Sequence, residues 1–411
     1  MPGDKLGERL KQRVSDLERK GLRKGKEVVI RAVLPPEADR GPRYLLEGYG
    51  DRPFLRMNAN SYLGLSLQEA VIAAEEAAVR RFGTGPGAVR FISGTYRPHV
   101  DLEMRLAAFH RREAAMIFSS AYATVMGVIA PLVDEDTVVL SDALNHNCII
   151  NAVRLARPRD KGVYRHLDMA DLESQIRQAA GKAGHLLIVT DGVFSMRGDY
   201  APLDVITALA ETYEGQFPRG ITLVVDDSHG VGALGETGRG TEEITGARGI
   251  DLLVATLGKA LGVNGGYVAA AGSVIDYLRE TAPFYVYSNP ITPAEAAAAL
   301  RALQILDSAP GRERLARLRR LTGRLESGLQ ALGYEVIPGP HPVVPLMIRD
   351  TRRTAELAAH LFENGILATG LKYPVVPRGD EEIRFQVTAD HTESDIDTVL
   401  TVLKEGTSIG L

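Results

Sequence analysis

Five short apolar runs alternate with helical patterns between residues 114 and 256, and this alternation constrains the fold more than any other feature of the chain. The runs are AAMIF (114–118), TVVL (137–140), HLLIVT (185–190), ITLVV (221–225) and DLLVAT (251–256). Segments with helical spacing lie between them, for example at 147–156 and 170–180. Continuous apolar strands separated by helices are typical of a parallel sheet that is covered on both faces. The sequence therefore predicts an α/β unit with a mostly parallel central sheet flanked by helices.

The pattern changes near residue 295, where long helical segments and short separate strands replace the regular alternation. A chain of 411 residues is also long for a single hydrophobic core. We predict an N-terminal helical segment over residues 1–55, a large domain over 56–295 and a smaller α+β C-terminal domain over 296–411. In the first of these, Leu6, Leu10, Val14 and Leu17 recur at helical spacing. They predict an amphipathic helix that lies on the body of the protein or on a partner subunit.

Composition excludes several functional classes. A formal net charge of −4 gives no reason to expect nucleic acid or an acidic membrane as a partner. No apolar stretch approaches the roughly 20 residues of a membrane-spanning helix, and no signal peptide is apparent. The only cysteine, Cys148, excludes an internal disulfide and fits a reducing compartment. We expect a cytoplasmic protein.

Polar residues follow each of the five apolar runs. In chain order they are Ser119 and Ser120, then Ser141 and Asp142 with Asn145 and His146, then Asp191, then Asp226 to His229, and finally Lys259. Open α/β sheets bind ligands outside the carboxyl ends of their strands. The sequence therefore predicts a site at that edge of the sheet.

Lys259 stands in TLGKALGVNGGY, among glycines and other small residues directly after a strand. A lysine that is desolvated there has a depressed pKa and becomes a nucleophile toward carbonyl compounds. The alternatives are a surface lysine at the end of a strand, or a nucleotide-binding phosphate loop. The second fails because no glycine stands five residues before Gly258.

Other residues of this edge have two interpretations when each is taken alone. Asp226, at the end of a buried strand, needs either a core arginine or the cation of a cofactor as its partner. His229 and His146 are either structural residues or neighbours of a flat ring. The junction at Ser120 to Tyr122 exposes main-chain N–H groups, which can bind a phosphate, and Thr256 could add a hydroxyl.

Two residues outside this edge are candidates for binding a substrate. Arg384 lies in the apolar strand EEIRFQV, where an arginine is unusual unless it pairs with an anion such as a carboxylate. Asn60, in NANSYLGLS, is either a binding residue or a helix cap.

Taken together, these motifs resemble those of a known family. They are NSYLGL, ISGT, LNHNCIINAVRLAR, TDGVFSMRGDYAPL, VVDDSHGVGALGETGRGT, TLGKALGVNGGY, YSNPITP and EIRFQVTADHT. From about residue 50 to 405 the chain resembles the α-oxoamine synthases, which are fold-type I enzymes dependent on pyridoxal 5′-phosphate (PLP). The resemblance implies the PLP-dependent transferase fold and a homodimer whose active site lies at the subunit interface. It implies no metal site.

For the cofactor ring, the resemblance implies four residues. Lys259 would form the internal aldimine, Asp226 would hold the pyridine N–H, His229 would bond the ring oxygen and His146 would stack on the ring. Lys259, His229 and His146 would be the catalytic residues.

For the cofactor phosphate, the resemblance implies the N–H groups at Ala121 and Tyr122, next to Ser120. The hydroxyl of Thr256 and that of Ser288 from the other subunit would join them. For the substrate, it implies that Asn60 and Arg384 hold the amino-acid carboxylate. Ser195 would lie near both cofactor and substrate.

The implied reaction condenses an amino acid with an acyl-CoA and releases CoA, with or without loss of carbon dioxide. RFISGT, DGVFSM and YPVVP favour glycine and acetyl-CoA. The alternative is an 8-amino-7-oxononanoate synthase, which uses alanine and a pimeloyl thioester, or another decarboxylating member. An inactive partner subunit is less favoured because Lys259, Asp226 and His229 are all present. Arg97 and His99, in GTYRPH, are further candidates for contact with the acyl-CoA.

Overall fold

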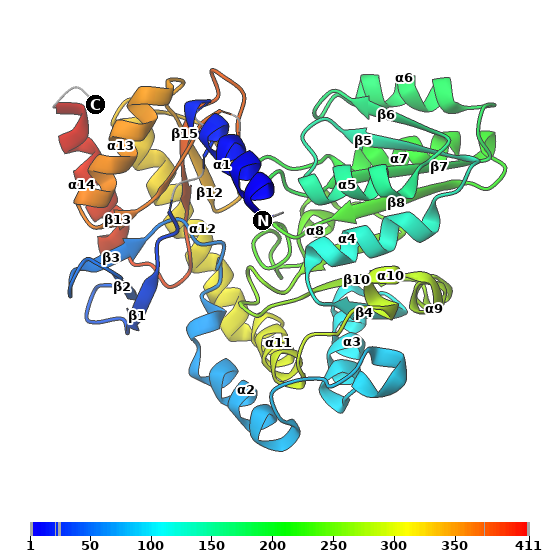
Figure 1. The fold of residues 1–411 in the computed structure, drawn as a ribbon, viewed down its shortest axis with the longest axis horizontal. Coiled ribbons are helices and arrows are strands. Elements are labelled where there is room, and N and C mark those ends of the chain that lie inside the picture. The colour runs from blue at the N-terminus through cyan, green and yellow to red at the C-terminus, as the bar shows by residue number, and fades with distance from the viewer. Residues whose placement is uncertain (1–2, 21, 24–25, 374, 409–411) are drawn as a thin grey trace.

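A seven-stranded sheet forms the centre of the computed structural model, which describes residues 3–20, 22–23, 26–373 and 375–408 (Figure 1). Its order is β4 (Ala114–Phe118), β10 (Gly266–Ala270), β9 (Leu252–Thr256), β8 (Ile221–Asp226), β7 (His185–Asp191), β5 (Thr137–Asp142) and β6 (Asp160–Tyr164). Only β10 runs antiparallel to its neighbours. The five predicted strands and their mostly parallel arrangement are confirmed. They could be predicted because they are almost fully buried, and a strand buried on both faces must be apolar throughout.

Helices cover both faces of this sheet. One face packs on α4 (Ala121–Ile129), α5 (Asn147–Ala156) and α9 (Gly272–Thr281). The other packs on α6 (Met169–Ala179) and α7 (Leu203–Tyr213) toward β6, and on α3 (Arg97–His110) and α11 (Pro293–Leu306) toward β4. The remaining helices of this region are α2 (Glu69–Phe82), α8 (Thr241–Thr245) and α10 (Pro283–Val286).

The C-terminal region forms a separate sheet in the order β11 (Glu335–Val336), β12 (Val343–Met347), β15 (Glu382–Gln386) and β14 (Thr369–Leu371). All of its pairings are antiparallel. The helices α12 (Ala309–Ala331), α13 (Thr351–Glu363) and α14 (Glu393–Ser408) accompany it (Figure 1). This agrees with the predicted α+β character of the region, while the boundary at residue 296 stays a prediction.

The prediction of a helical segment over residues 1–55 is correct only for α1 (Gly3–Arg19). The following residues form β1 (Ile30–Leu34), β2 (Arg43–Leu46) and β3 (Pro53–Arg56). With β13 (Ile366–Leu367) these make a four-stranded sheet beside the C-terminal region (Figure 1). The strands were missed because each has only four or five residues, and because Arg31 interrupts the apolar residues of β1.

Helix α1 makes little contact with the rest of the chain. Its apolar residues Leu6, Leu10, Val14 and Leu17 are 44–51% exposed. The expectation that this stripe lies on the protein's own body is therefore wrong, and contact with a partner subunit stays a prediction. Within the described part of the chain, no helix combines the length and the apolar character needed to cross a membrane.

Candidate active site

The carboxyl ends of the parallel strands place acidic and basic side chains at one edge of the central sheet. Strand β7 ends at Asp191, and its neighbour β8 ends at Asp226 in direct register with it. Lys259 follows the end of β9 by three residues. The charges of Asp226, Asp191 and Arg384 all act on the pKa of Lys259, so the Lys259 amine lies within electrostatic range of residues from both sheets. We call this group the Lys259 site.

The loop that carries Lys259 is tightly folded. Leu257 N–H donates to Gly265 O at 2.9 Å, and Val263 N–H donates back to Leu257 O at 3.0 Å. Gly262 has φ +73°, and a Cβ there would lie 2.6 Å from Ser66 N. Only glycine fits this position, because the backbone conformation and the space both exclude a side chain. The small residues around Lys259 are thus required by the fold of the loop.

The surroundings of the Lys259 amine act on its pKa in both directions. Burial lowers its pKa below the ordinary lysine value, and Arg384 lowers it further, whereas Asp226 and Asp191 act in the opposite direction. A lysine with a lowered pKa has a larger neutral fraction, which is the form that attacks a carbonyl group.

Asp226 forms the buried floor of the site. It is 6% exposed, and its Oδ1 accepts the N–H of Ser228 at 3.1 Å. The thiol of Cys148 lies 3.7 Å from the other oxygen, Oδ2. Asp191 is its acidic neighbour, and burial followed by the charge of Asp226 raises the pKa of Asp191 well above its ordinary value. No arginine bonds Asp226 in the described structure, which removes the core-arginine alternative and leaves this carboxylate suited to a cationic partner.

His229 is held by a tyrosine from the N-terminal part of the chain. The Tyr62 hydroxyl lies 2.6 Å from His229 Nδ1. Burial, followed by the charge of Lys259, lowers the pKa of His229 well below its ordinary value, so the ring is neutral. With Tyr62 donating to Nδ1, the ring carries its proton on Nε2 and can donate there. The main-chain oxygen of His229 accepts from His341 Nε2 at 2.9 Å.

His146 caps the N-terminus of α5, and its ring is exposed. Its main-chain N–H donates to Asp191 Oδ2 at 2.7 Å. Burial lowers the pKa of His146, although Asp226 acts to raise it. Asn145 bridges the strands beneath, donating to Val189 O and accepting from Asp191 N–H. This exposed, neutral ring is available to cover a flat ligand.

The N-terminus of α4 offers free donors. The hydroxyl of Ser120 caps the helix by accepting from Ala123 N–H at 3.1 Å. The N–H groups of Ala121 and Tyr122 have no acceptor among the described residues. A Cβ at Gly266 would lie 2.4 Å from Ala121 N, so that glycine lets β10 approach this helix end. Free N–H groups at a helix N-terminus suit a phosphate.

Thr256 ends β9 close to these donors, since it faces Gly266 of β10 in the sheet. Its hydroxyl donates to Gly265 O at 3.2 Å and accepts from Gly258 N–H at 3.0 Å. In this structure the hydroxyl therefore holds the lysine loop.

Arg384 and Asn60 meet across the two parts of the molecule. Arg384 Nη2 donates to Asn60 Oδ1 at 3.3 Å, and Gln386 Nε2 lies 3.0 Å from the same oxygen. The buried Nε of Arg384 has no hydrogen-bond partner in the described structure. An unsatisfied buried guanidinium N–H is costly, and a carboxylate would satisfy it.

Three further predicted residues are not joined to this group. Ser195 lies in the loop after β7, and Ser288 follows α10, and neither makes a described hydrogen bond with the Lys259 site. Their roles stay predictions. The expected contact of His99 with an acyl-CoA is wrong, because the residue is fully buried with Nδ1 bonded to Tyr96 N–H and Nε2 to Ile291 O.

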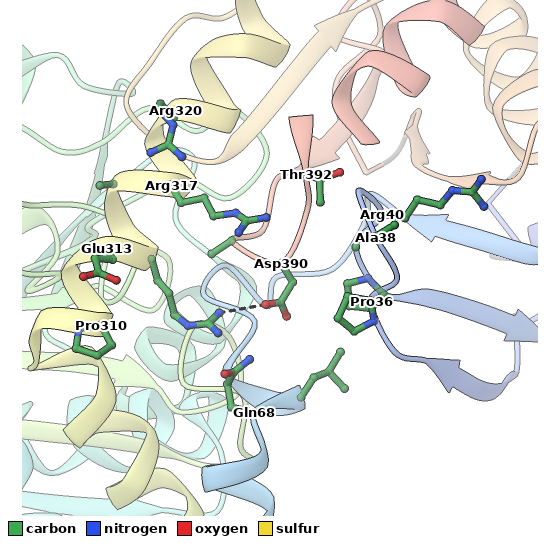
Figure 2. Close-up of a pocket in the computed structure, with 16 residues that line it drawn as sticks. Pro36, Ala38, Arg40, Gln68, Pro310, Glu313, Arg317, Arg320, Asp390 and Thr392 are labelled. Atoms are coloured by element: carbon green, nitrogen blue, oxygen red, sulfur yellow. Dashed lines mark hydrogen bonds and ion pairs between the residues drawn. The ribbon is translucent and has the colours of Figure 1, made fainter. Parts of the chain in front are cut away.

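A cavity of about 820 Å³ opens elsewhere, between α12, residues 36–42 and the loop at 389–392 (Figure 2). Its arginines include Arg317 and Arg320, and Asp390 pairs with Arg314 at 3.0 Å. None of the residues of the Lys259 site lines this cavity. Arg317 and Arg320 in its lining are exposed to solvent, and this cavity is separate from the Lys259 site.

Comparison with known proteins explains the arrangement. The family model for aminotransferases of class I and II matches residues 52–403. An 8-amino-7-oxononanoate synthase of Thermosipho melanesiensis is 39% identical and covers 89% of this chain and 90% of its own. The human mitochondrial 2-amino-3-ketobutyrate coenzyme A ligase is 40% identical, and the match covers 87% of this chain and 83% of the ligase. The chain belongs to the α-oxoamine synthases.

The solved structure of a serine palmitoyltransferase from Sphingomonas wittichii resembles this α-oxoamine synthase with a TM-score of 0.88 and 26% identity, over 98% of each chain. The predicted PLP-dependent transferase fold is thereby confirmed, as is PLP as the cofactor of the family to which the chain belongs. The free N–H groups at α4, the acidic floor at Asp226 and the Lys259 amine fit that cofactor.

Sequence reasoning missed some residues of this α-oxoamine synthase site. Tyr62 had no assigned role beyond its place in the motif NANSYLGLS, Asp191 was placed only at the end of a strand, and Cys148 served only to exclude a disulfide. The position of Asp191 at a strand end was a usable signal. His341 had none, because it reaches His229 from a segment 112 residues away.

Proposed function

We propose that the chain is an acyl-CoA:amino-acid C-acyltransferase that condenses glycine with acetyl-CoA, releases CoA and works as a cytoplasmic homodimer. The observation that carries this proposal is the meeting of Lys259 with Asp226, His229 and Arg384 in one group, combined with the membership of the α-oxoamine synthases.

The residues have distinct proposed roles toward the cofactor. Lys259 would hold it covalently, Asp226 would keep a proton on its ring nitrogen, and His229 Nε2–H would donate to its ring oxygen. His146 would cover the ring face. Ala121 and Tyr122 N–H groups would bind the phosphate.

Thr256 and the partner's copy of Ser288 would add hydroxyls to that phosphate. When bound, PLP would accept the electron pair that remains after a proton leaves the α-carbon of the amino acid.

Substrate binding would use Arg384, whose buried Nε has no hydrogen-bond partner in the described structure. Arg384 and Asn60 would fix the amino-acid carboxylate, so that its α-hydrogen faces Lys259 Nζ. Once the amine of the substrate had replaced Lys259 on the cofactor, the freed Nζ would remove that proton. The α-carbon would then form a bond with the thioester carbonyl carbon while the C–S bond breaks and CoA leaves. The resulting β-keto acid could lose carbon dioxide.

Cofactor binding is tested by the absorption spectrum of the protein with PLP. We expect a visible band that disappears in Lys259→Ala and persists in Lys182→Ala, whose side chain is exposed and outside the site. A band unchanged in Lys259→Ala would contradict the proposal.

Substrate choice is tested by release of free thiol from a panel of acyl-CoAs mixed with glycine, alanine or serine. Fastest release with glycine and acetyl-CoA is expected. The second candidate is alanine with a pimeloyl thioester. The 39% identity to an 8-amino-7-oxononanoate synthase supports it about as well as the 40% identity to the 2-amino-3-ketobutyrate ligase supports the first candidate. No release with any pair, despite bound PLP, would indicate an inactive partner subunit.

A further inference from the structure

Cys148 contacts two residues of the Lys259 site, although the proposed chemistry gives it no role. It stands in the first turn of α5 and is 2% exposed. Its Sγ lies 3.7 Å from Asp226 Oδ2 and 2.9 Å from His146 Nδ1. One small side chain thus contacts both the acidic floor and the imidazole of the Lys259 site.

We propose that Cys148 is a positioning residue that orients Asp226 through its thiol and His146 through its main-chain N–H. The proposal rests on the proposed function, because it assumes that these two side chains face PLP. Nothing in it requires Cys148 itself to touch the cofactor or the substrate.

The thiol has one proton and two acceptors within reach, His146 Nδ1 at 2.9 Å and Asp226 Oδ2 at 3.7 Å. Because the main-chain N–H of Cys148 already donates to Nδ1, the thiol proton is assigned to Asp226. Burial, and then the charges of Asp226 and Asp191, raise the pKa of the Cys148 thiol far above its ordinary value, so it keeps its proton. Since Ser228 N–H occupies Oδ1 of Asp226, a thiol donating to Oδ2 gives each carboxylate oxygen one donor. Both oxygens of the carboxylate are then bonded, which fixes the carboxylate in its plane.

The main chain of Cys148 acts on His146. Its N–H donates to His146 Nδ1 at 3.3 Å. A main-chain N–H can only donate, so Nδ1 is an acceptor and the neutral ring carries its proton on Nε2. This fixes the tautomer of the ring that would cover the cofactor.

A nucleophilic role for this cysteine is inconsistent with its surroundings. Asp226 and Asp191 disfavour the thiolate, and no other cysteine is present for a disulfide. The remaining ionisable neighbours are His146, which contacts the thiol, and Lys259, whose pKa the cysteine influences. Orientation of Asp226 is what this geometry provides.

Three variants separate donation from packing. Cys148→Ser keeps a donor of similar size, and Cys148→Ala removes it. Val153→Ala deletes buried volume from the same helix without touching Asp226, because Val153 is 6% exposed and packs in the same apolar cluster. For each protein, the Kd for PLP, the pH midpoint of the bound-cofactor absorption and the Tm of the apoprotein are measured.

We expect Cys148→Ser to bind PLP within about twofold of the wild type, and Cys148→Ala to bind about tenfold more weakly with a shifted pH midpoint. Val153→Ala should lower only the Tm. Wild-type binding and midpoint in Cys148→Ala, or equal defects in the Ser and Ala variants, would overturn the proposal.

Two further results complete the test. If Cys148→Ala does not fold, ¹⁵N NMR of the wild-type apoprotein tests the tautomer of His146 instead. An Nε2–H tautomer supports the proposal, and an Nδ1–H tautomer would overturn it. Failure of the proposed function looks different, because thiol release would then be absent with every substrate pair while PLP binding still responds to the Cys148 substitutions.

Discussion

The hydroxyl of Tyr62 lies 2.6 Å from Nδ1 of His229, joining a residue of the N-terminal part of the chain to the end of a central strand. Tyr62 is fully buried, and burial raises the pKa of its phenol, so it remains a donor. When this phenol donates to Nδ1, the neutral ring of His229 carries its proton on Nε2.

Tyr62→Phe should lower kcat/KM about tenfold, because the neutral His229 ring loses the partner that fixes its tautomer. Tyr267→Phe is the matched control, since Tyr267 is also fully buried and its hydroxyl lies 2.7 Å from a histidine nitrogen, His110 Nε2. This pair is not part of the Lys259 site. That control should lose stability and keep its kcat/KM. Steady-state kinetics and thermal unfolding of both variants check this, and equal kcat/KM values in the two would contradict it.

Arg384→Lys should raise KM for the amino acid by about 30- to 100-fold, because a lysine cannot supply the planar pair of donors that a carboxylate needs. KM for the acyl-CoA should change much less. Arg324→Lys is the control, because Arg324 makes a similar paired contact, at 2.8 Å to Asp397, on the exposed surface. A comparable rise of KM for both substrates in Arg384→Lys would contradict a specific carboxylate contact.

Gly266→Ala should reduce PLP affinity strongly, since the added Cβ would come within 2.4 Å of Ala121 N and displace the helix end that has the free donors. Its φ is not in the left-handed region, so the effect is steric. Gly323→Ala, where a Cβ meets nothing within 4 Å, should leave PLP affinity unchanged and stabilise its helix slightly. Titration of the apoproteins with PLP measures both, and unaltered affinity in Gly266→Ala would exclude this helix end as the phosphate site.

His166 should give the protein a pH-dependent stability. Burial alone would lower its pKa, but hydrogen bonds to Asp142 and Asp199 outweigh this and raise it from 6.5 to about 9. The raised value means that the folded state binds the proton more tightly, so the stabilisation is complete below about pH 6.5 and is lost as the pH rises through about 9.

His166→Gln should therefore lower the free energy of unfolding by about 1 kcal/mol at pH 6, a value reduced for solvent screening of this half-buried group, and by little at pH 9.5. Urea unfolding at the two pH values measures the difference. His185→Gln is the control, because burial lowers the pKa of His185 and its proton-linked effect has the opposite sign. A constant difference between wild type and His166→Gln across this range would contradict the assignment.

The sequence allowed much of the central sheet to be predicted, because strands buried on both faces must be apolar throughout. Two strands escaped for physical reasons. Strand β6 (DKGVY) is an edge strand that is largely exposed, and β10 (GYVAA) has a single β-branched residue and begins with a glycine that leaves room for helix α4. Neither shows the β-branched run on which the prediction depended.

For the site, residues at strand ends were predictable, because parallel strands deliver their carboxyl ends to one edge. Asp226 ends β8 and Lys259 follows the neighbouring strand β9, while their roles stay predictions. Contacts between distant segments were not predictable, as with His341 and the main chain of His229, since no local pattern records them. The same applies to Cys148, whose two contacts depend on how helix α5 is seated on the sheet.

The pairing of β3 with β13 bears on how this protein is made on the ribosome. Asn58, just after β3, bonds Thr369 at 3.2 Å, a partner 311 residues further along the chain. At about 5–20 residues per second, β3 leaves the ribosome roughly 15–60 s before the strand that completes its sheet is synthesised. The first strands must therefore stay soluble during most of translation, and the antiparallel pairings of β1 with β2 and of β2 with β3 are the contacts of this sheet that do not depend on β13.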